Sequence, residues 1–343
     1  MIYQAGRDPS NPFFSTLCTS RAVFAISRIN DTLHLVRAKA WDAVAHIPGE
    51  CRPVEPLKSV VFKPRETVAQ LMTDSNGPAI QEQIVIGVKN CDLSALKIHD
   101  FVFLADPQDP FYKTTREKTI IVSCDCTDCL EVCFCTAVKE QPYAKAGFDI
   151  NISPLAGSML VESGSAKGEA LLKSMGQILK PASDTQVQER DRKREEMTRK
   201  VESQAEAKGL KASDDLHKAV KKTVESDLWD DFAKNCVECG ACNYTCCTCH
   251  CFLLADGTDD KKALARVRQW DSCLLKNFAR VAGNANPRKH RAERLYNRFD
   301  KKFVFFPTVL KTYACDGCGR CVQACTGKID IREVLKKALD EAR

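Results

Sequence analysis

The stretch "CVECGACNYTCCTCHC" occupies residues 236–251, and seven of its sixteen residues are cysteine. Its first four thiols, from Cys236 to Cys246, follow the spacing Cys-x2-Cys-x2-Cys-x3-Cys. The same spacing returns in "CDGCGRCVQAC", from Cys315 to Cys325. Bacterial ferredoxins use this run to hold cubane [4Fe-4S] clusters. Two complete runs, separated by a stretch with helical spacing, predict an α-helical, ferredoxin-type dicluster domain.

The run also predicts which thiols share a cluster. In two-cluster ferredoxins, the first three cysteines of a run hold one cluster and the fourth holds the other. We therefore expect one cluster on Cys236, Cys239, Cys242 and Cys325, and the second on Cys315, Cys318, Cys321 and Cys246. Ferredoxin runs usually continue with proline, but here Cys247 and Thr326 follow. Cys247 can therefore compete with Cys246.

Composition bounds the class of protein. The 343 residues include 20 cysteines, most of them in three groups, a pattern that favours metal sites over disulfides in a long chain. Residues 1–14 lack the features of a signal peptide, and no apolar stretch is long enough to cross a membrane. We therefore expect a cytoplasmic protein, in a reducing compartment, with no transmembrane segment.

The formal charge of +6 does not predict a nucleic-acid partner. A cubane with four thiolates carries a charge of about −2, so three clusters would cancel the excess. The densest basic run, "RKHRAERLYNRFDKK" at residues 288–302, is interpreted as a solvated helix face or a docking face for an acidic partner.

Residues 1–182 alternate strand-like and helix-like patterns, which predicts an α/β domain with a mixed or parallel sheet. Two buried strands are expected at Ile84–Val88 and Thr119–Val122. A helix is expected directly after the first strand, with Asn90 or Asp92 as its N-cap.

A third group of cysteines, "CDCTDCLEVCFC" at residues 124–135, follows the second of these strands, and Cys91 follows the first. The carboxyl ends of neighbouring parallel strands meet at one edge of a sheet, where ligands bind. We therefore expect a third [4Fe-4S] cluster on Cys91, Cys126, Cys133 and Cys135. Cys124 and Cys129 are alternative ligands, and a zinc site or a set of buried thiols is the alternative for the whole group.

Residues 183–227 are highly charged and predict a helical linker to a helical domain at residues 228–343. Within that domain, apolar spacing predicts a helix in residues 259–283 that ends at Gly283, and a last helix at residues 330–343. The remaining thiols of this half are expected to be small buried groups near the clusters: Cys247, Cys249, Cys251 and Cys273.

The chain resembles the beta subunit of soluble archaeal sulfhydrogenases and the A subunit of anaerobic sulfite reductases. The segments that carry the resemblance are "IVIGVKNCDLSALKIHD", "VCFCTAV", "GFDI", "CVECGACNYTCCTCHCF", "WDSC", "NPRKHRAERLYNRFDKKFVFFP" and "CDGCGRCVQACTGKIDI". The resemblance implies an anaerobic hetero-oligomeric complex in which this subunit relays electrons between a flavoprotein, FAD-containing and NAD(P)-linked, and a catalytic redox subunit. It also places the eight ferredoxin-type cysteines and Cys91, Cys126, Cys133 and Cys135 in matching segments.

We therefore expect an electron-transfer subunit without catalytic residues of its own, since motifs such as GxGxxG, the P-loop and HExxH do not occur. The alternative is a redox enzyme with its own substrate site at the N-terminal cysteine cluster. A zinc-based scaffold is a further alternative.

Overall fold

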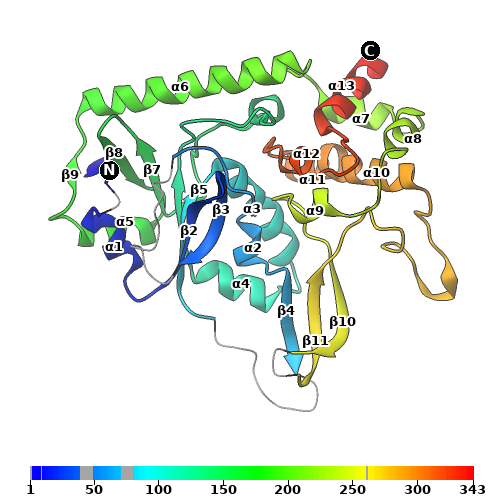
Figure 1. The fold of residues 1–343 in the computed structure, drawn as a ribbon, viewed down its shortest axis with the longest axis horizontal. Coiled ribbons are helices and arrows are strands. Elements are labelled where there is room, and N and C mark those ends of the chain that lie inside the picture. The colour runs from blue at the N-terminus through cyan, green and yellow to red at the C-terminus, as the bar shows by residue number, and fades with distance from the viewer. Residues whose placement is uncertain (1, 9, 39–48, 71–79, 260–261) are drawn as a thin grey trace.

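The computed structural model describes residues 2–8, 10–38, 49–70, 80–259 and 262–343. A mixed sheet with its helices occupies one end of the molecule, and helices near the C-terminus occupy the other (Figure 1). This arrangement confirms an α/β region followed by a helical region.

The main sheet has eight strands in the order β3-β2-β5-β6-β7-β8-β1-β9. The pairs β2/β5, β5/β6 and β6/β7 are parallel, and the other pairs are antiparallel, so the sheet is mixed. The strand bounds are β1 Ile2–Gly6, β2 Ala22–Ile29, β3 Thr32–Ala38, β5 Gln83–Val88, β6 Thr119–Cys124, β7 Ile150–Pro154, β8 Ser158–Ser163 and β9 Lys180–Pro181.

Helices cover both faces of this sheet. One apolar core lies between the sheet and α1 and α5, and a second lies between the sheet and α2, α3 and α4. All residues of β5 and β6 are buried, as expected for central parallel strands covered on both faces. The helix bounds are α1 Pro12–Cys18, α2 Lys58–Val61, α3 Asn90–Phe103, α4 Pro110–Glu117 and α5 Ala166–Ser174.

The start of α3 differs from the prediction. Its N-cap is Lys89, and no side chain caps the helix, so the prediction of Asn90 or Asp92 as N-cap is wrong. Both side chains have other partners. The Asn90 amide donates to the carboxylate of Glu140, and Asp92 forms a buried bidentate ion pair with Arg320. These long-range contacts outweigh the local capping preference.

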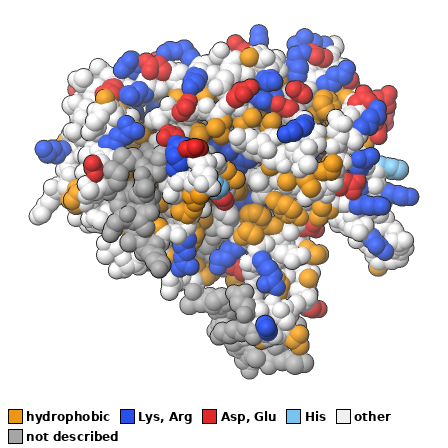
Figure 2. All heavy atoms as spheres, viewed as in Figure 1, with side chains coloured by type: hydrophobic (Ala, Val, Ile, Leu, Met, Phe, Trp, Pro, Cys, Tyr) orange, Lys and Arg blue, Asp and Glu red, His pale blue; other side chains and the backbone are white. Residues whose placement is uncertain are grey.

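Helix α6 (Asp184–Ala207) connects the two ends of the molecule and begins with a capping box between Ser183 and Gln186. Basic and acidic side chains alternate along the edge that it forms (Figure 2). The helix is nevertheless not solvated all round, because Met197 and Val201 pack against Cys135. The charged helix is confirmed, whereas the domain boundaries at residues 183 and 227 stay a prediction.

The helices that follow share one core, in which α7, α8, α10 and α13 pack together. The last helix, α13, confirms the helix predicted for the end of the chain. The bounds are α7 Leu216–Lys222, α8 Leu228–Ala233, α9 Ala241–Tyr244, α10 Arg291–Asp300, α11 Phe306–Leu310, α12 Arg320–Gln323 and α13 Ile331–Ala342. A π-helical turn at Lys301–Phe305 joins α10 to α11, and short 3-10 turns occupy Cys135–Val138 and Ala282–Asn284.

The helix predicted in residues 259–283 is wrong. The structure places a hairpin there, of β10 (Phe252–Thr258) and β11 (Leu264–Trp270), and β11 also pairs with β4 (Arg65–Gln70). Buried Ala265 and Val267 alternate with exposed Leu264 and Arg266, which is the period of a strand. The apolar spacing of these residues is compatible with a helix and with a strand. Pairing with β4, which is distant in the sequence, decides for the strand. Among the described residues, no helix is long and apolar enough to cross a membrane.

Candidate metal centres

The two cysteine runs fold alike. In each run a glycine with positive φ, Gly240 (φ 74°) or Gly319 (φ 68°), begins the short helix α9 or α12. Two residues earlier, Glu238 (φ 58°) and Gly317 (φ 63°) are also left-handed. Two left-handed residues bend the chain tightly, so that the first three thiols of the run face one side.

The surroundings explain why one run has a second glycine and the other has Glu238. A Cβ on Gly317 would lie 2.4 Å from the Cα of Cys135, and one on Gly319 would lie 2.3 Å from the carbonyl oxygen of Val132. The second run therefore packs directly on the middle cysteine group. The first run lies at the surface, where Glu238 fits and Cys239 is exposed.

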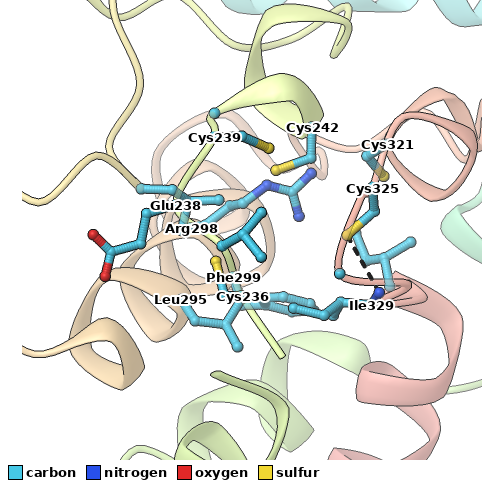
Figure 3. Close-up of a pocket in the computed structure, with 15 residues that line it drawn as sticks. Cys236, Glu238, Cys239, Cys242, Leu295, Arg298, Phe299, Cys321, Cys325 and Ile329 are labelled. Carbon is cyan, nitrogen blue, oxygen red and sulfur yellow. Dashed lines mark hydrogen bonds between the residues drawn. The ribbon is translucent and has the colours of Figure 1, made fainter. Parts of the chain in front are cut away.

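One pocket holds the thiols predicted for the first cluster. Cys236, Cys239, Cys242 and Cys325 all line it, with Cys321 at its side (Figure 3). The backbone amide of Ile329 donates to the sulfur of Cys325 at 3.2 Å. The structure thus brings the fourth cysteine of the second run to the first three of the first run. The ligand assignment itself stays a prediction.

The thiols predicted for the second cluster are less exposed: Cys246, Cys315 and Cys318 are buried, and Cys321 is half-buried. Burial, with the neighbouring Cys321 and Cys246 thiolates, raises the pKa of Cys315. Cys246 therefore lies near the second run, as the crossed assignment requires. Cys247 is also close, because its sulfur lies 3.8 Å from the sulfur of Cys318. Cys247 thus stays a competitor for the fourth ligand position.

The third group surrounds another pocket. The predicted Cys91, Cys126, Cys133 and Cys135 all line it, together with Cys129, Cys51 and Cys318. Cys124 does not line this pocket; its thiol lies beside the ammonium of Lys89. Sequence reasoning missed Cys51, which stands alone in the chain. Its neighbour Gly49 is held at the group because the Thr127 hydroxyl donates to the Gly49 carbonyl at 2.7 Å.

Each cysteine group contains at least one buried cation. Arg298 faces the first pocket, where its Nε donates to Asn243 at 2.9 Å, and its Nη2 has no hydrogen-bond partner among the described residues. Lys302 donates to the sulfur of Cys246 at 3.2 Å. Lys89, which is fully buried, donates to the carbonyl oxygen of Asp125 at 3.2 Å in the third group.

The charges acting on these cations are mainly those of thiolates. Burial alone would lower the pKa of Lys302, but the Cys246 and Cys249 thiolates outweigh it and raise the pKa well above its usual value. In the same way, the Cys242 and Cys321 thiolates outweigh the effect of burial and raise the pKa of Arg298.

Without a metal, many of these thiols would not supply that charge. Burial raises the pKa of Cys242 and of Cys126 to about 12, so both thiols would be protonated at neutral pH. Arg298 beside Cys242 and Lys89 beside Cys126 would then lack these counter-charges, at a cost of several kcal/mol per ion. A thiolate-bound iron–sulfur cluster carries net negative charge and removes this cost. The residues present therefore fit such clusters.

Single metal ions are a different case. Among the described residues, no three His, Cys, Asp or Glu side chains lie close enough together to hold one ion. The thiols line pockets instead, and a cubane keeps its four sulfur ligands apart because the cube lies between them.

The basic run at residues 288–302 is not the solvated helix face that its composition indicated. Arg294, Arg298 and Lys302 are buried. Arg294 pairs with Glu238 at 2.9 Å and donates to the carbonyl oxygens of Arg288 and Lys289, so it anchors the first run. The basic residues were visible in the sequence, but their burial follows from the packing of α10 between the two cysteine runs.

Of the other cysteines, Cys247 and Cys273 are buried, and Cys249 and Cys251 are half-buried. The Asn243 amide donates to the sulfur of Cys273 at 3.2 Å. This agrees with the expectation of small groups near the clusters.

Two comparisons with known proteins bear on these cysteine groups. Residues 235–329 match the family model described as a 4Fe-4S dicluster domain. The helical region carries a 4Fe-4S dicluster domain. Such a domain holds two [4Fe-4S] clusters, so the chain is an iron–sulfur protein. The whole chain is also similar to "Sulfhydrogenase 2 subunit beta" of Pyrococcus furiosus, with 28% identity over 335 residues, 96% of this chain and 95% of the relative. The resemblance drawn from the cysteine-rich segments is thereby confirmed.

In the dicluster domain, Lys302→Met is expected to lower the reduction potential of the cluster that Cys246 is predicted to bind. Reduction adds negative charge, and the variant loses both a buried positive charge and an N–H···S hydrogen bond. We expect a shift of at least about 59 mV, which is tenfold in the equilibrium of a one-electron couple. Potentiometric titration followed by electron paramagnetic resonance measures it. Lys301→Met is the matched control, because Lys301 is exposed. Equal shifts in both variants would contradict the role of Lys302.

Proposed function

We propose that this protein relays electrons, one at a time, through three adjoining [4Fe-4S] clusters. When bound, such clusters supply one-electron transfer. The observation that carries the proposal is the overlap of the cysteine groups. Cys321 belongs to the second predicted set but lines the first pocket, and Cys318 of the same set lines the third pocket. The second group is therefore the middle of a line.

The chain's own residues have three tasks in this relay. The cysteine thiolates hold the clusters, with the eight ferredoxin-type cysteines on two of them and Cys91, Cys126, Cys133 and Cys135 on the third. The buried cations Arg298, Lys302 and Lys89 compensate the charge. Packing of the second run on the middle group, where the Phe134 amide donates to the Gly317 carbonyl at 2.8 Å, keeps the groups together and excludes water.

The partners follow from the similarity to a sulfhydrogenase beta subunit. We infer a hetero-oligomer in which a flavoprotein with FAD, linked to NAD(P), lies at one end of the line and a catalytic redox subunit, a hydrogenase or sulfite reductase or similar, at the other. Thiolate-bound clusters need a reducing compartment, so we also infer an anaerobic cytoplasm. No catalytic residue is assigned to this chain.

Iron and acid-labile sulfide analysis of the anaerobically purified full-length protein tests the proposal. About twelve irons per chain are expected for three cubanes, and about eight for the dicluster domain alone. Four or fewer irons, or stoichiometric zinc, would contradict it.

The alternative of a redox enzyme with its own substrate site has a separate readout. Turnover of hydrogen or sulfite by the isolated, fully loaded chain with an artificial electron donor or acceptor would favour that alternative over the relay.

A further inference from the structure

We propose that the surface around the first cysteine pocket is the docking site for an acidic redox protein that exchanges electrons with the cluster held there. The proposal rests on the proposed function, because it needs a cluster in that pocket. Two residues that line this pocket are exposed to solvent. Cys239 is exposed, and the neighbouring Val237 is 59% exposed. Among the predicted cluster ligands, only Cys239 is exposed, and the others are buried or half-buried.

Three segments surround these two residues, and we call them the basic rim: residues 234–239, 276–291 and 326–328. The second segment is held at the first by α10. Arg291 donates to the carbonyl oxygen of Cys236 at 2.9 Å. Arg294 holds Glu238 and the backbone of residues 288 and 289 at the same time. The third segment touches the first, because a Cβ on Gly327 would lie 2.0 Å from the carbonyl oxygen of Asn235.

The charged side chains of the rim are almost all of one sign. Its one carboxylate is that of Glu238, which two arginines engage. Its basic side chains, exposed except for the half-buried Arg288, are Lys234, Lys276, Arg280, Arg288, Lys289, Arg291 and Lys328.

This composition differs from that of α6, although Lys234 of the rim pairs with Asp231 just outside it at 2.7 Å. On α6, lysines and arginines alternate with glutamates and form pairs such as Arg192 with Glu196 at 3.1 Å. Lys276 and Lys289 of the rim form no ion pair with the residues that the structure describes, and their own segment contains no Asp or Glu. A one-sign field beside an exposed apolar residue attracts an oppositely charged partner and orients it during encounter.

The occupant that fits is therefore an acidic protein with its own redox centre near its surface. Val237 offers it an apolar contact at the centre, and the rim offers the charges around it, which is the usual anatomy of a transient interface. A small anionic acceptor or a nucleic acid would use the charges but not the apolar centre.

The experiment compares two haem proteins of opposite charge as one-electron acceptors. The full-length protein, loaded with clusters and reduced by dithionite, is mixed with oxidised cytochrome b5, which is acidic, or cytochrome c, which is basic. One electron passes to each haem iron(III) and gives iron(II), and the haem spectrum reports the rate. The test variant is Lys276→Glu/Lys289→Glu. The matched control is Arg37→Glu/Lys180→Glu, which makes the same change in net charge on β3 and β9, the two edges of the main sheet.

At low ionic strength, the rim variant is expected to reduce cytochrome b5 at least about tenfold more slowly than the unmodified protein and to reduce cytochrome c faster. The control is expected to stay within about twofold, and high salt should remove the difference. Equal changes in rim variant and control would overturn the proposal, and so would unchanged rates in the rim variant. Iron content and paramagnetic resonance are measured on every sample. Protein that lacks iron would contradict the proposed relay, whereas cluster-loaded protein with unchanged rates would contradict only the docking site.

Discussion

Cys325→Ser is expected to alter the cluster of the first run and to leave that of its own run intact. The reason is the crossed geometry, in which Cys325 lines the pocket of Cys236, Cys239 and Cys242 (Figure 3). Loss of one of four thiolates changes the cluster or prevents its assembly, so the variant is expected to lose up to about four irons per chain. Paramagnetic resonance of the reduced protein, at full length, identifies the signal that changes.

The control for this experiment comes from the same run. Cys315→Ser is expected to change the other signal, because Cys315 is buried near Cys246 and Lys302. If Cys325→Ser and Cys315→Ser change the same signal, the crossed assignment is wrong. Cys247→Ser adds a further readout, since a changed second signal would show that Cys247, and not Cys246, completes that cluster.

Cys91→Ser is expected to reduce the iron content from about twelve to about eight per chain, because the third cluster would lose one of its four predicted thiolate ligands. Cys91 is the one predicted ligand that comes from α3, across the pocket from the 126–135 loop. Its loss opens one side of the site. Iron and sulfide analysis and paramagnetic resonance of the full-length variant give the result.

Cys124→Ser is the matched control, since Cys124 comes from the same group but does not line the pocket. It is expected to keep the iron of the unmodified protein. The same iron content in Cys91→Ser and the unmodified protein would remove the third cluster or show that Cys51 or Cys129 takes its place. Cys51→Ser and Cys129→Ser, each combined with Cys91→Ser, distinguish these two results.

The sequence predicted the mixed sheet and the ferredoxin-type runs because both depend on local patterns. β5 and β6 have the pattern of short apolar strands, and the helical connection between them, α3 and α4, allows their parallel pairing. Cysteine spacing, with Gly240 and Gly319 at the bends, is enough to turn three thiols toward one side. Even the meeting of Cys91 with the middle group follows from a general rule of parallel sheets.

Other features depend on contacts between distant segments. Residues 264–270 fit a helix by their spacing, and only pairing with β4 makes them a strand. Asn90 and Asp92 are good N-caps by type, but Glu140 and Arg320 engage their side chains instead. Cys51 belongs to no motif and reaches the third group only through the fold.

The basic residues show most directly what the sequence determines and what the tertiary structure decides. The sequence determined how many basic residues the chain has and that "RKHRAERLYNRFDKK" is rich in them. Only the tertiary structure decided that Arg298 and Lys302 turn inward to the cysteine thiols, while Lys276 and Lys289 stay in solvent. The physical reason is that burial is a property of the whole packed chain. A residue's chemistry is fixed by its type, but the dielectric around it and the charges that face it come from segments that are far away in the sequence.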